Sequence, residues 1–516
     1  MNKYTFFYLK KQIYLYLCIY FNNLNMKLSD IILESTEEQK ILDFLKHKIK
    51  GTEWENRVFL AGGAVRDEIM GKHPKDLDFL IDGELSAGID FSIWLGKELG
   101  EYKKDSNPVI FPRYGTSKLS ISKNKHNLPN IDLEFVAPRK EKYTKGSRKP
   151  IVSGGKLMDD VLRRDLSINS LLKNITTDEI LDLTGKGIND IKKGIIRTTS
   201  DPEIIFKEDP LRLIRTIRFM TKYNFKITKS TYDNIVKNAE LINTISKERV
   251  KDELNKILEG NNPSKGINLL RKTGLLKYII GEFNDTIGMT QNIHHNQDVF
   301  QHSLSVLKNT PPDLKTRLMA LFHDIGKVLT KTVSPDGSVH FYGHEDASEK
   351  MVKDIMFRLK YPNELINAVA TGVKHHMDLK HGDDDASKIS DKSLRKFVTA
   401  VGENLTHILD LIHADNISHS DESSMKNQIN NVRQRIDKLN SQVNKSNFKL
   451  PINGDDLIAL GMKPSQQFRE ILQLIQDAWY DNPNITRDDA MKIVDMYRSK
   501  ITNNINEIKS IINSVG

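Results

Sequence analysis

The chain has a single cysteine, Cys18, and lacks any long uncharged hydrophobic run. One cysteine excludes a framework of intrachain disulfides and is typical of a reducing compartment, so we expect a cytoplasmic protein. The most apolar segment, residues 1–25, is interrupted by Lys10 and Lys11, and its uncharged runs fall short of the ~20 residues that a membrane span needs. No small-residue cleavage site of a signal peptide is evident. We therefore expect no membrane association, and a dispensable extension before a fold that begins near Met26.

The composition is that of an ordinary soluble protein with several domains. A chain of 516 residues is too long for one hydrophobic core and is expected to form about three to five domains. Hydrophobic residues make up 38% and charged residues 28%, which excludes a largely disordered chain. Lys and Arg outnumber Asp and Glu by 77 to 68, and the resulting net charge of +9 mildly favours a polyanionic partner such as nucleic acid.

The pattern of apolar residues changes along the chain. Residues 58–155 alternate short β-like runs such as "RVFLA", "LDFLID" and "IDLEFVA" with helical runs, which predicts an α/β unit. Within this unit, the Lys-, Arg-, Gly- and Pro-containing segment 137–150 is predicted to be a mobile basic connection. After Gly155 the strand signal almost disappears, and apolar residues recur at spacings of three and four. The fold class is therefore predicted to be α+β, with a mixed head followed by helical domains.

The stretch "FLAGGAVRDEIMGKHPKDLDFLID", residues 59–82, combines a glycine turn with two carboxylates. Gly62 and Gly63 at a strand-to-helix junction would let backbone N–H groups approach phosphate oxygens. Asp76 and Asp78 would project from the same face of a strand, where their repulsion is unfavourable unless a cation lies between them. A solvated charged strand edge is the simpler explanation of such a pair, but the apolar flanks indicate a packed strand. Mg²⁺, which prefers carboxylates together with substrate phosphates, is the expected ligand.

A third acidic position comes from "NIDLEFVAPR", in which Asp132 and Glu134 share one strand face. A carboxylate from a neighbouring strand would complete a site for displacement at the α-phosphate of a nucleotide. In such a site, one metal activates the attacking 3′-hydroxyl and another steadies the leaving pyrophosphate. Catalysis would depend on positioning and charge neutralisation, without a covalent nucleophile.

Seven segments occur in a defined order: "GGAVRD", "KDLDFLID", "RYGTSKLSI", "IDLEFVAPRKEKY", "RKPIVSGGKLMDDVLRRDLSINSLL", "ILDLTGKGINDIKKGIIRT" and "FKEDPLRLIRTIRF". Together they resemble the family of class II tRNA nucleotidyltransferases (CCA-adding enzymes) and bacterial poly(A) polymerases, within the polymerase beta nucleotidyltransferase superfamily. The resemblance implies that Asp76 and Asp78 hold the catalytic metals and that Glu134 is the third catalytic acid. The nucleotide-binding residues that it implies are Gly63, Arg66, Arg164, Asp165, Glu208, Asp209, Arg212 and Arg215.

The segment "EDPLR", residues 208–212, corresponds to the family's nucleotide-selecting motif. Asp209 and Arg212 are three apart on a predicted helix and so would face the same way. An acceptor carboxylate beside a forked donor can match the edge of a base, which would allow cytosine or adenine to be chosen without a template. A surface ion pair of little energetic value is the alternative.

Most histidines of the chain fall between residues 294 and 420, in segments that include "VFQHSLSVL", "MALFHDIGK", "FYGHEDAS", "VKHHMDL" and "LIHADNISH". Imidazole and carboxylate groups on separate helices suit a hydrolytic metal site, and an Asp beside the apolar run "LMALF" would be costly to bury without a partner. The pattern resembles the HD phosphohydrolase domain. That resemblance implies one divalent metal or two, with a transition metal among the candidates, held by His302, His323, Asp324, His344, His376 and Asp415. An HD domain retained only as scaffold is the alternative.

Five segments are expected: the extension 1–25, a nucleotidyltransferase head at 26–155, a helical neck for nucleotide selection and RNA binding at 156–285, an HD domain at 286–425, and a helical tail at 426–516. The resemblance implies a metal-dependent, template-independent enzyme that adds CCA to tRNA 3′ ends from CTP and ATP, fused to an HD phosphohydrolase that acts on 2′,3′-cyclic or terminal phosphates. The expected partners are nucleoside triphosphates and the tRNA 3′ end and elbow, bound by shape through dispersed Lys and Arg, with the oligomeric state left open.

Three alternatives remain. A poly(A) polymerase, or a partial enzyme that adds only CC or only A, would keep the same fold. A protein that acts chiefly as an HD phosphohydrolase on RNA ends or nucleotides would use the head for binding, and the intact Asp76, Asp78 and Arg212 count against it. A non-catalytic RNA-binding scaffold fits least well, because both sites are complete in the sequence.

Overall fold

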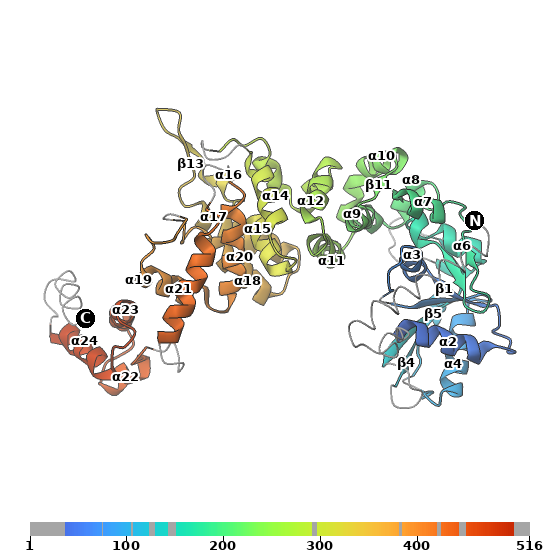
Figure 1. The fold of residues 1–516 in the computed structure, drawn as a ribbon, viewed down its shortest axis with the longest axis horizontal. Helices are drawn as coiled ribbons and strands as arrows, with labels where there is room; N and C mark the ends of the chain where they lie inside the picture. Colours follow the sequence, from blue (N-terminus) through green and yellow to red (C-terminus); the bar gives the residue numbers. More distant parts are fainter. Residues whose placement is uncertain are drawn as a thin grey trace, which may run out of the picture. The chain divides into compact units, whose positions relative to one another are not determined.

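The computed structural model describes residues 37–74, 76–104, 107–122, 130–142, 151–291, 297–380, 384–419, 425–442 and 450–499 (Figure 1). The extension predicted at residues 1–25 lies outside these ranges. The chain divides into two compact units: unit 1 is Met1–Glu208 with Lys226–Thr231, and unit 2 is Asp209–Phe225 with Tyr232–Gly516. None of the described helices combines the length and the apolar character that crossing a bilayer requires.

Unit 1 is built on a seven-stranded mixed sheet with the order β3-β4-β5-β2-β1-β8-β9. Its central strands β2 and β5 run parallel, whereas the other neighbours in the sheet are antiparallel. The bounds are β1 (Val58–Ala61), β2 (Asp78–Ile81), β3 (Val109–Phe111), β4 (Thr116–Ile121), β5 (Ile131–Val136), β8 (Leu172–Asn174) and β9 (Ile180–Leu181). The mixed sheet is followed along the chain by a mainly helical part, which confirms the predicted α+β fold class.

The two faces of this sheet are covered differently. On one face α4 (Ala87–Glu98) packs against β4 and β5, and the ring of Phe91 meets that of Phe135 at a centroid distance of 5.0 Å. The helix α2 (Glu37–Ile49) lies beside β1 and buries Ile41, Leu45 and Ile49 (Figure 1). On the other face α6 (Leu157–Leu162) contributes to a small apolar cluster of Phe59, Ala61, Leu80, Val161 and Leu172. This second face also carries the acidic side chains of β2 and β5.

Two features of unit 1 differ from the sequence-based expectation. Part of the predicted basic loop is a hairpin of β6 (Arg139–Lys142) and β7 (Ile151–Gly154), while residues 143–150 lie outside the described residues. The sheet also continues beyond the head boundary predicted at residue 155, through β8 and β9. Strands of two to four residues are too short to produce a clear alternation in the sequence.

Unit 1 ends with α7 (Gly187–Lys193), β10 (Ile195–Ile196), α8 (Pro202–Glu208) and β11 (Lys226–Ile227), while α3 (Gly63–Ile69) lies earlier in the chain; α10 (Lys229–Asn238) has residues in both units. The remainder is helical apart from the short hairpin of β12 (Thr332–Val333) and β13 (Val339–His340). Its helices are α9 (Leu211–Tyr223), α11 (Lys247–Leu258), α12 (Pro263–Lys272), α13 (Leu276–Ile279), α14 (Val299–Asn309), α15 (Leu314–Phe322), α16 (Lys327–Thr330), α17 (His344–Arg358), α18 (Asn363–His375), α19 (Asp391–Val401), α20 (Leu405–Asn416), α21 (Gln428–Gln442), α22 (Gly454–Ala459), α23 (Gln466–Asp481) and α24 (Arg487–Ser499).

Within unit 2, five helices pack around the histidine-rich centre: α14, α15, α17, α18 and α20. Phe283, Phe300 and Phe322 form an aromatic cluster beside them, with centroid distances of 5.7 and 5.8 Å from Phe283. The last three helices have a core of their own, formed by Ile452, Leu457, Phe468, Ile471, Ile475, Ala490 and Val494. A buried polar centre is therefore enclosed by helices whose other faces supply the apolar packing.

Candidate active sites

The acidic residues of the head meet where β2 and β5 run side by side. Asp78 begins β2 and stands opposite Glu134 of β5 in the parallel register. Asp76 lies just before the strand, and the exposure of Asp76 and Asp78 alternates with the burial of Leu77 and Phe79, so the two carboxylates share a face. The structure thus brings together the three acids predicted from the sequence.

The electrostatics of Asp78 show that these groups interact. Its pKa is raised above the ordinary value, first because surrounding protein removes part of its hydration, and further by the negative charges of Glu134 and Asp76. The positive charge of Arg164 acts in the opposite direction. Three carboxylates that repel one another and remain accessible are suited to a divalent cation, so the residues present fit the Mg²⁺ expected from the sequence.

Arg164 is held by a residue that sequence reasoning missed. Asp160 of α6 is fully buried and accepts hydrogen bonds from Arg164 Nε at 3.0 Å and Nη2 at 2.9 Å, and from Arg163 Nε at 2.9 Å. Burial alone would raise the pKa of Asp160, but the two arginines lower it below its ordinary value. The i,i+4 spacing of Asp160 and Arg164 on a helical stretch was a readable signal.

The glycine turn sits directly beside this arginine. Gly62 has φ +65°, a left-handed conformation that favours glycine, and a Cβ there would lie 2.9 Å from Arg164 Nη1. Gly63 begins α3, as the predicted strand-turn-helix requires.

Two predicted nucleotide-binding residues are instead buried in a polar network. Arg66 is 4% exposed; it donates to Asp67 Oδ1 at 2.8 Å and also bonds Asn169 Oδ1. Asp165 accepts from the backbone N–H of Leu166 at 2.8 Å and from Asn169 Nδ2 at 3.1 Å. Asn169 therefore joins Arg66 and Asp165 beside the turn, and their contact with a nucleotide stays a prediction. No sequence signal pointed to Asn169, because its link to Arg66 spans 103 positions.

The "EDPLR" motif runs from the end of α8 into α9. Glu208 is the last residue of α8 and belongs to unit 1, whereas Asp209 and Arg212 belong to unit 2. Asp209 Oδ2 pairs with Arg249 Nη2 of α11 at 3.0 Å, and Arg212 is buried. Arg249 was missed because the pair spans 40 positions.

Arg215 lies one turn further along α9. Its Nη1 is 3.9 Å from Glu253 Oε1, and Arg218 Nε is 2.6 Å from Glu253 Oε2. Glu253 is only 3% exposed. An acidic side chain of α11 thus anchors the basic face of α9.

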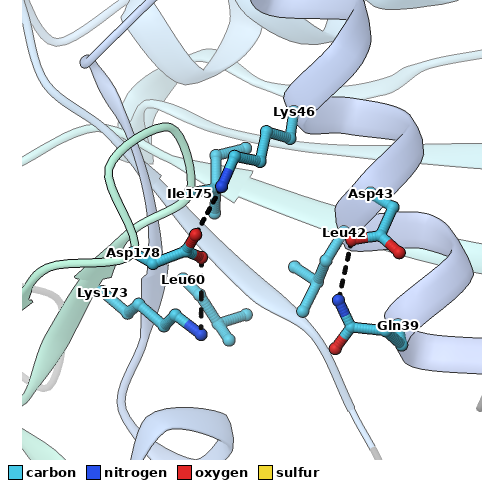
Figure 2. Close-up of a pocket in the computed structure, with 8 residues that line it drawn as sticks. All are labelled: Gln39, Leu42, Asp43, Lys46, Leu60, Lys173, Ile175 and Asp178. Atoms are coloured by element: carbon cyan, nitrogen blue, oxygen red, sulfur yellow. Dashed lines mark hydrogen bonds and ion pairs between the residues drawn. The ribbon is translucent and has the colours of Figure 1, made fainter. Parts of the chain in front are cut away.

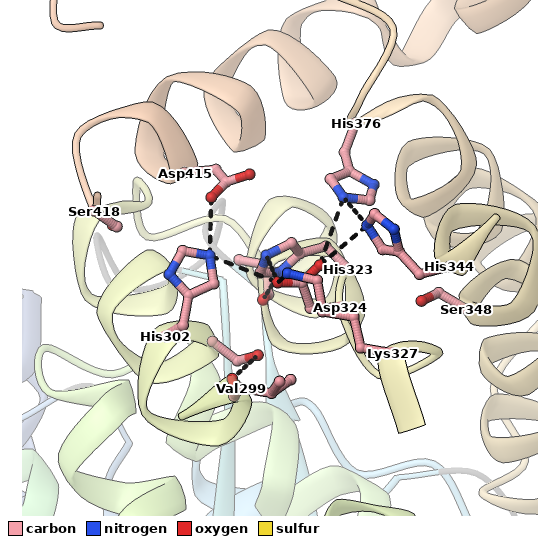
Figure 3. Close-up of polar contacts among 12 residues, drawn as sticks. Val299, His302, His323, Asp324, Lys327, His344, Ser348, His376, Asp415 and Ser418 are labelled. Carbon is pink, nitrogen blue, oxygen red and sulfur yellow. Dashed lines mark hydrogen bonds and ion pairs between the residues drawn. The ribbon is translucent and has the colours of Figure 1, made fainter. Parts of the chain in front are cut away.

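The HD residues converge on Asp324, which follows α15 (Figure 3). Asp324 Oδ2 lies 3.2 Å from His323 Nε2 and 3.6 Å from His302 Nε2, while Oδ1 lies 3.3 Å from His344 Nε2 and 3.8 Å from His376 Nε2. His302 also lies 3.0 Å from Asp415 Oδ1 of α20. All six predicted residues are therefore in one buried centre.

Backbone carbonyls fix the orientation of three of these rings. The Nδ1 atoms of His323, His344 and His376 lie 2.9, 2.9 and 2.6 Å from the carbonyl oxygens of Ala320, Phe341 and Val373. A hydrogen bond at Nδ1 selects the tautomer that leaves Nε2 unprotonated toward the centre, as in metal-binding histidines.

The donor set suits one metal or two. His302, His323 and Asp324 form one close group and Asp324, His344 and His376 another, with ligand atoms within 4.8 Å of one another in each. Burial alone would raise the pKa of Asp324, but His323 and Lys327 hold it well below its ordinary value, so the carboxylate is ionised. Burial and the neighbouring His323 and His344 keep the pKa of His376 well below its ordinary value, so its imidazole is neutral. Ionised carboxylates and neutral imidazoles are the forms that bind divalent metals.

Three further residues of this centre were missed from the sequence. Lys327 Nζ lies 2.7 Å from Asp324 Oδ2, Lys380 Nζ pairs with Asp415 Oδ2, and His419 Nε2 lies 3.5 Å from Asp415 Oδ1. Lys327 follows Asp324 by three positions and His419 follows Asp415 by four. On a helical stretch this spacing could have predicted both contacts. Lys380 lies 35 positions before Asp415, and nothing in the sequence indicated it.

A separate pocket in unit 1 lies between α2 and the strands β1 and β8 (Figure 2). It is lined by Gln39, Leu42, Asp43, Lys46, Leu60, Lys173, Ile175 and Asp178. Asp178 bonds Lys46 and lies 3.7 Å from Lys173. None of the predicted site residues lines this pocket, which lies on the side of the sheet away from the acidic cluster.

Comparison with known proteins agrees with this geometry. The poly(A) polymerase head domain matches residues 58–197, the probable RNA- and SrmB-binding site of polymerase A matches residues 224–286, and the HD domain matches residues 299–417. The multifunctional CCA protein of Neisseria meningitidis is 32% identical over 318 residues, which cover 59% of this chain and 69% of that protein. The chain belongs to the tRNA nucleotidyltransferase and poly(A) polymerase family. The multifunctional CCA protein of Haemophilus influenzae is 30% identical, with 60% and 71% covered.

Other relatives match over less of their length. The mitochondrial CCA tRNA nucleotidyltransferase of Candida glabrata is 35% identical over 233 residues, which cover 42% of each chain. The chain spans about half the length of three of the curated relatives that it matches, 42%, 54% and 45% of each. Among solved structures, the Bacillus stearothermophilus CCA-adding enzyme in complex with CTP has a TM-score of 0.61 at 19% identity, with 90% of this chain and 98% of that chain covered. This likeness shows that the fold is shared.

Proposed function

We propose that this family member is a metal-dependent, template-independent nucleotidyltransferase that adds C, C and A to tRNA 3′ ends from CTP and ATP. The observation that carries the proposal is the parallel pairing of Asp78 with Glu134, with Arg164 held by Asp160 beside them. Relatives named as multifunctional CCA proteins support CCA addition over the other outcomes of the fold. A CC-adding or an A-adding enzyme is an alternative, because relatives with these two names also match. A poly(A) polymerase of the same fold is a further alternative.

In the head, Asp76, Asp78 and Glu134 would hold Mg²⁺, which when bound neutralises charge on the triphosphate and favours ionisation of the attacking 3′-hydroxyl. Arg164 would bind phosphate oxygens with the part of its guanidinium that Asp160 leaves available. Gly62 keeps the turn close to Arg164 because it has no side chain.

Base selection is assigned to Asp209 and Arg212, whose carboxylate and guanidinium would meet the base edge. In this proposal Arg249 is a positioning residue that holds the Asp209 carboxylate. Glu208 begins the motif and Arg215 lies three residues beyond its end. The tRNA elbow would be bound through dispersed Lys and Arg of the helical part.

The HD centre is proposed to be a second, hydrolytic active site for 2′,3′-cyclic or terminal phosphates. Its six His and Asp residues would hold a divalent metal, which when bound supplies an activated water for phosphate-ester hydrolysis. Lys327 and Lys380 offer positive charge to phosphate oxygens. A purely structural HD domain would not need three imidazoles oriented with Nε2 toward one carboxylate.

One experiment tests the main proposal: tRNA that ends at the discriminator base is incubated with CTP, with ATP and with both, and the products are sequenced. Addition of C, C and then A, followed by arrest, is expected. A long A tract with ATP alone would instead establish a poly(A) polymerase, and arrest after CC or addition of A only to tRNA-CC would establish a partial enzyme.

Two substitutions separate the proposed sites. Asp78→Ala should abolish nucleotide addition and leave hydrolysis of adenosine 2′,3′-cyclic phosphate intact, whereas Asp324→Ala should do the reverse. Asp132→Ala is the matched control, because this exposed carboxylate on β5 is paired with Lys118 at 2.7 Å and is expected to change addition less than about threefold. Loss of both activities in a folded single variant contradicts the separation.

The cellular location is also a proposal. The single cysteine favours the cytoplasm. Relatives from Candida glabrata and Saccharomyces cerevisiae are named as mitochondrial, so fractionation of cells that express the tagged chain is the deciding measurement.

A further inference from the structure

A short hairpin beside the HD centre carries an exposed aromatic pair. β12 and β13 pair at Thr332–His340 and Val333–Val339, between Lys327 of α16 and His344 of α17. The rings of His340 and Tyr342 are stacked, with centroids 5.2 Å apart and planes at 11°. Tyr342 is 78% exposed, the largest value among the exposed apolar and aromatic residues of the described chain. A flat ring is thus held open to solvent next to a buried catalytic centre.

Phe341, which follows the hairpin, contacts two residues of the HD centre. Lys327, which pairs with Asp324, has its Nζ 5.3 Å from the centroid of Phe341. The carbonyl of Phe341 accepts the Nδ1–H of His344 and so aims that ring at Asp324. Tyr342 is the next residue, two positions before His344, so their Cα atoms are at most about 7 Å apart. The backbone of Tyr342 is therefore held close to a residue of the HD centre.

We propose that Tyr342, stacked on His340, is the binding platform for the nucleobase of a nucleotide or RNA end whose 2′- or 3′-phosphate enters the HD centre. The chemistry of the centre selects the occupant, because oriented imidazoles with Lys327 and Lys380 suit a phosphate ester. A base joined to that phosphate by one ribose reaches a nearby aromatic face, and stacking accepts every base. This inference rests on the proposed hydrolase function and assigns a specific residue to recognition of the base.

The hydrolysis to be measured is ring opening of a 2′,3′-cyclic phosphate. The oxygen of one water bonds to phosphorus and keeps one proton. One P–O ester bond breaks, and the leaving ribose oxygen takes the other proton and becomes a hydroxyl. Adenosine 2′,3′-cyclic phosphate and glycerol 1,2-cyclic phosphate carry the same reacting group, and only the first has a base. Comparing them isolates the contribution of stacking from that of the chemistry.

For Tyr342→Ala we expect kcat/KM for the adenosine substrate to fall about 5- to 10-fold, mainly through KM, with no change for the glycerol substrate. Tyr342→Phe should retain wild-type values, because the ring is kept. Phe357→Ala is the matched control: Phe357 is 65% exposed on the same unit, near the far end of α17, and its loss should change neither substrate. Equal losses for both substrates, or no loss with Tyr342→Ala, would overturn the proposal.

A binding measurement keeps this test independent of hydrolysis. Calorimetric affinities of adenosine 3′-monophosphate and glycerol 2-phosphate are compared for the wild type and Tyr342→Ala. Tighter binding of the nucleotide, lost in the variant, supports stacking even if no hydrolysis is detected, in which case only the proposed hydrolase activity fails. If the wild type binds both ligands with equal affinity, the proposal that Tyr342 binds the base is refuted, whatever the activity. The exposed ring would then be assigned to contact with a protein partner.

Discussion

Replacement of Asp160 by Asn tests whether a buried carboxylate aims Arg164 at the head site. The substitution keeps the size of the side chain and removes its charge. Asp160 is 0% exposed, accepts two hydrogen bonds from Arg164 at 2.9 and 3.0 Å, and shares a further pair with Arg163. Breaking a buried ion pair costs about 3–5 kcal/mol. The arginine side chains are 19% and 21% exposed, so water offsets part of that cost and we expect about 3 kcal/mol.

The same substitution should slow nucleotide addition. If Arg164 no longer points at a phosphate, a charge-assisted interaction of about 1.5–3 kcal/mol is lost, which corresponds to a decrease of about 10- to 160-fold in the rate of addition. Stability is measured by urea unfolding with tryptophan fluorescence, since Trp54 and Trp94 of the three tryptophans lie in unit 1. Hydrolysis at the HD centre of unit 2 serves as the internal control for intact protein.

Asp178→Asn is the matched control within the same unit. Its carboxylate is 58% exposed, and its surface pairs with Lys46 and Lys173 are worth at most about 1 kcal/mol. If Asp160→Asn unfolds at the same urea concentration and adds nucleotides at the same rate as this control, the assigned role of Asp160 is refuted. A loss of stability without a loss of addition would leave Asp160 as a structural residue alone.

Three further predictions address the turn, the base-selecting motif and the tail. Gly62→Ala should destabilise unit 1 by about 1–2 kcal/mol because φ is +65°, and an unchanged thermal midpoint would contradict this. Arg249→Ala should release Asp209 and reduce the discrimination between CTP and ATP in single-nucleotide addition, with Arg249→Lys intermediate; unchanged discrimination in both would remove its positioning role. A hydrogen bond to Glu470, aided by lost hydration, raises the pKa of Tyr497 to about 12, so its stabilising contribution is present below pH ~10 and is lost as pH rises through 12. The absorbance difference between wild type and Tyr497→Phe should show tyrosinate forming near pH 12, and a midpoint near 10 would contradict it.

The acidic residues were predictable from residue alternation together with the ordered motifs. A period of two fixes Asp76 and Asp78 on one face, and the ordered motifs added Glu134 from a distant segment. Their meeting across parallel strands is what the register then confirmed. Likewise, the HD residues could be collected from the sequence, since imidazole and carboxylate are rare among buried side chains without a partner.

The supporting residues were less predictable, and the reason is physical. Each of the missed residues bonds or pairs with a residue far away in the chain: Asn169 with Arg66, Arg249 with Asp209, and Lys380 with Asp415. The sequence around a polar residue does not indicate which distant partner tertiary packing will bring to it. Arg66 was predicted to contact nucleotide, yet it is buried against Asp67 and Asn169. A motif identifies which side chains gather at a turn but not which of them point outward.

Both candidate sites bring carboxylates close together, but they differ in how the negative charge is compensated. In the head, Asp78 is exposed, and its pKa is raised by lost hydration and by the negative charges of Glu134 and Asp76. Under the proposed function, substrate phosphates would add further oxygen ligands to a cation held there. In the HD centre, the carboxylates are buried, their pKa values are well below the ordinary value, and Lys327 and Lys380 compensate their charge.

Such a preoriented set of nitrogen and oxygen donors favours a metal that stays with the protein. Under the proposed function, the open acidic face of the head would favour Mg²⁺ that arrives and leaves with each nucleotide. Pyrophosphate would have to leave after every addition, which a weakly held metal would allow. Hydrolysis in a buried centre gains from a resident metal, because only the phosphate ester then has to enter.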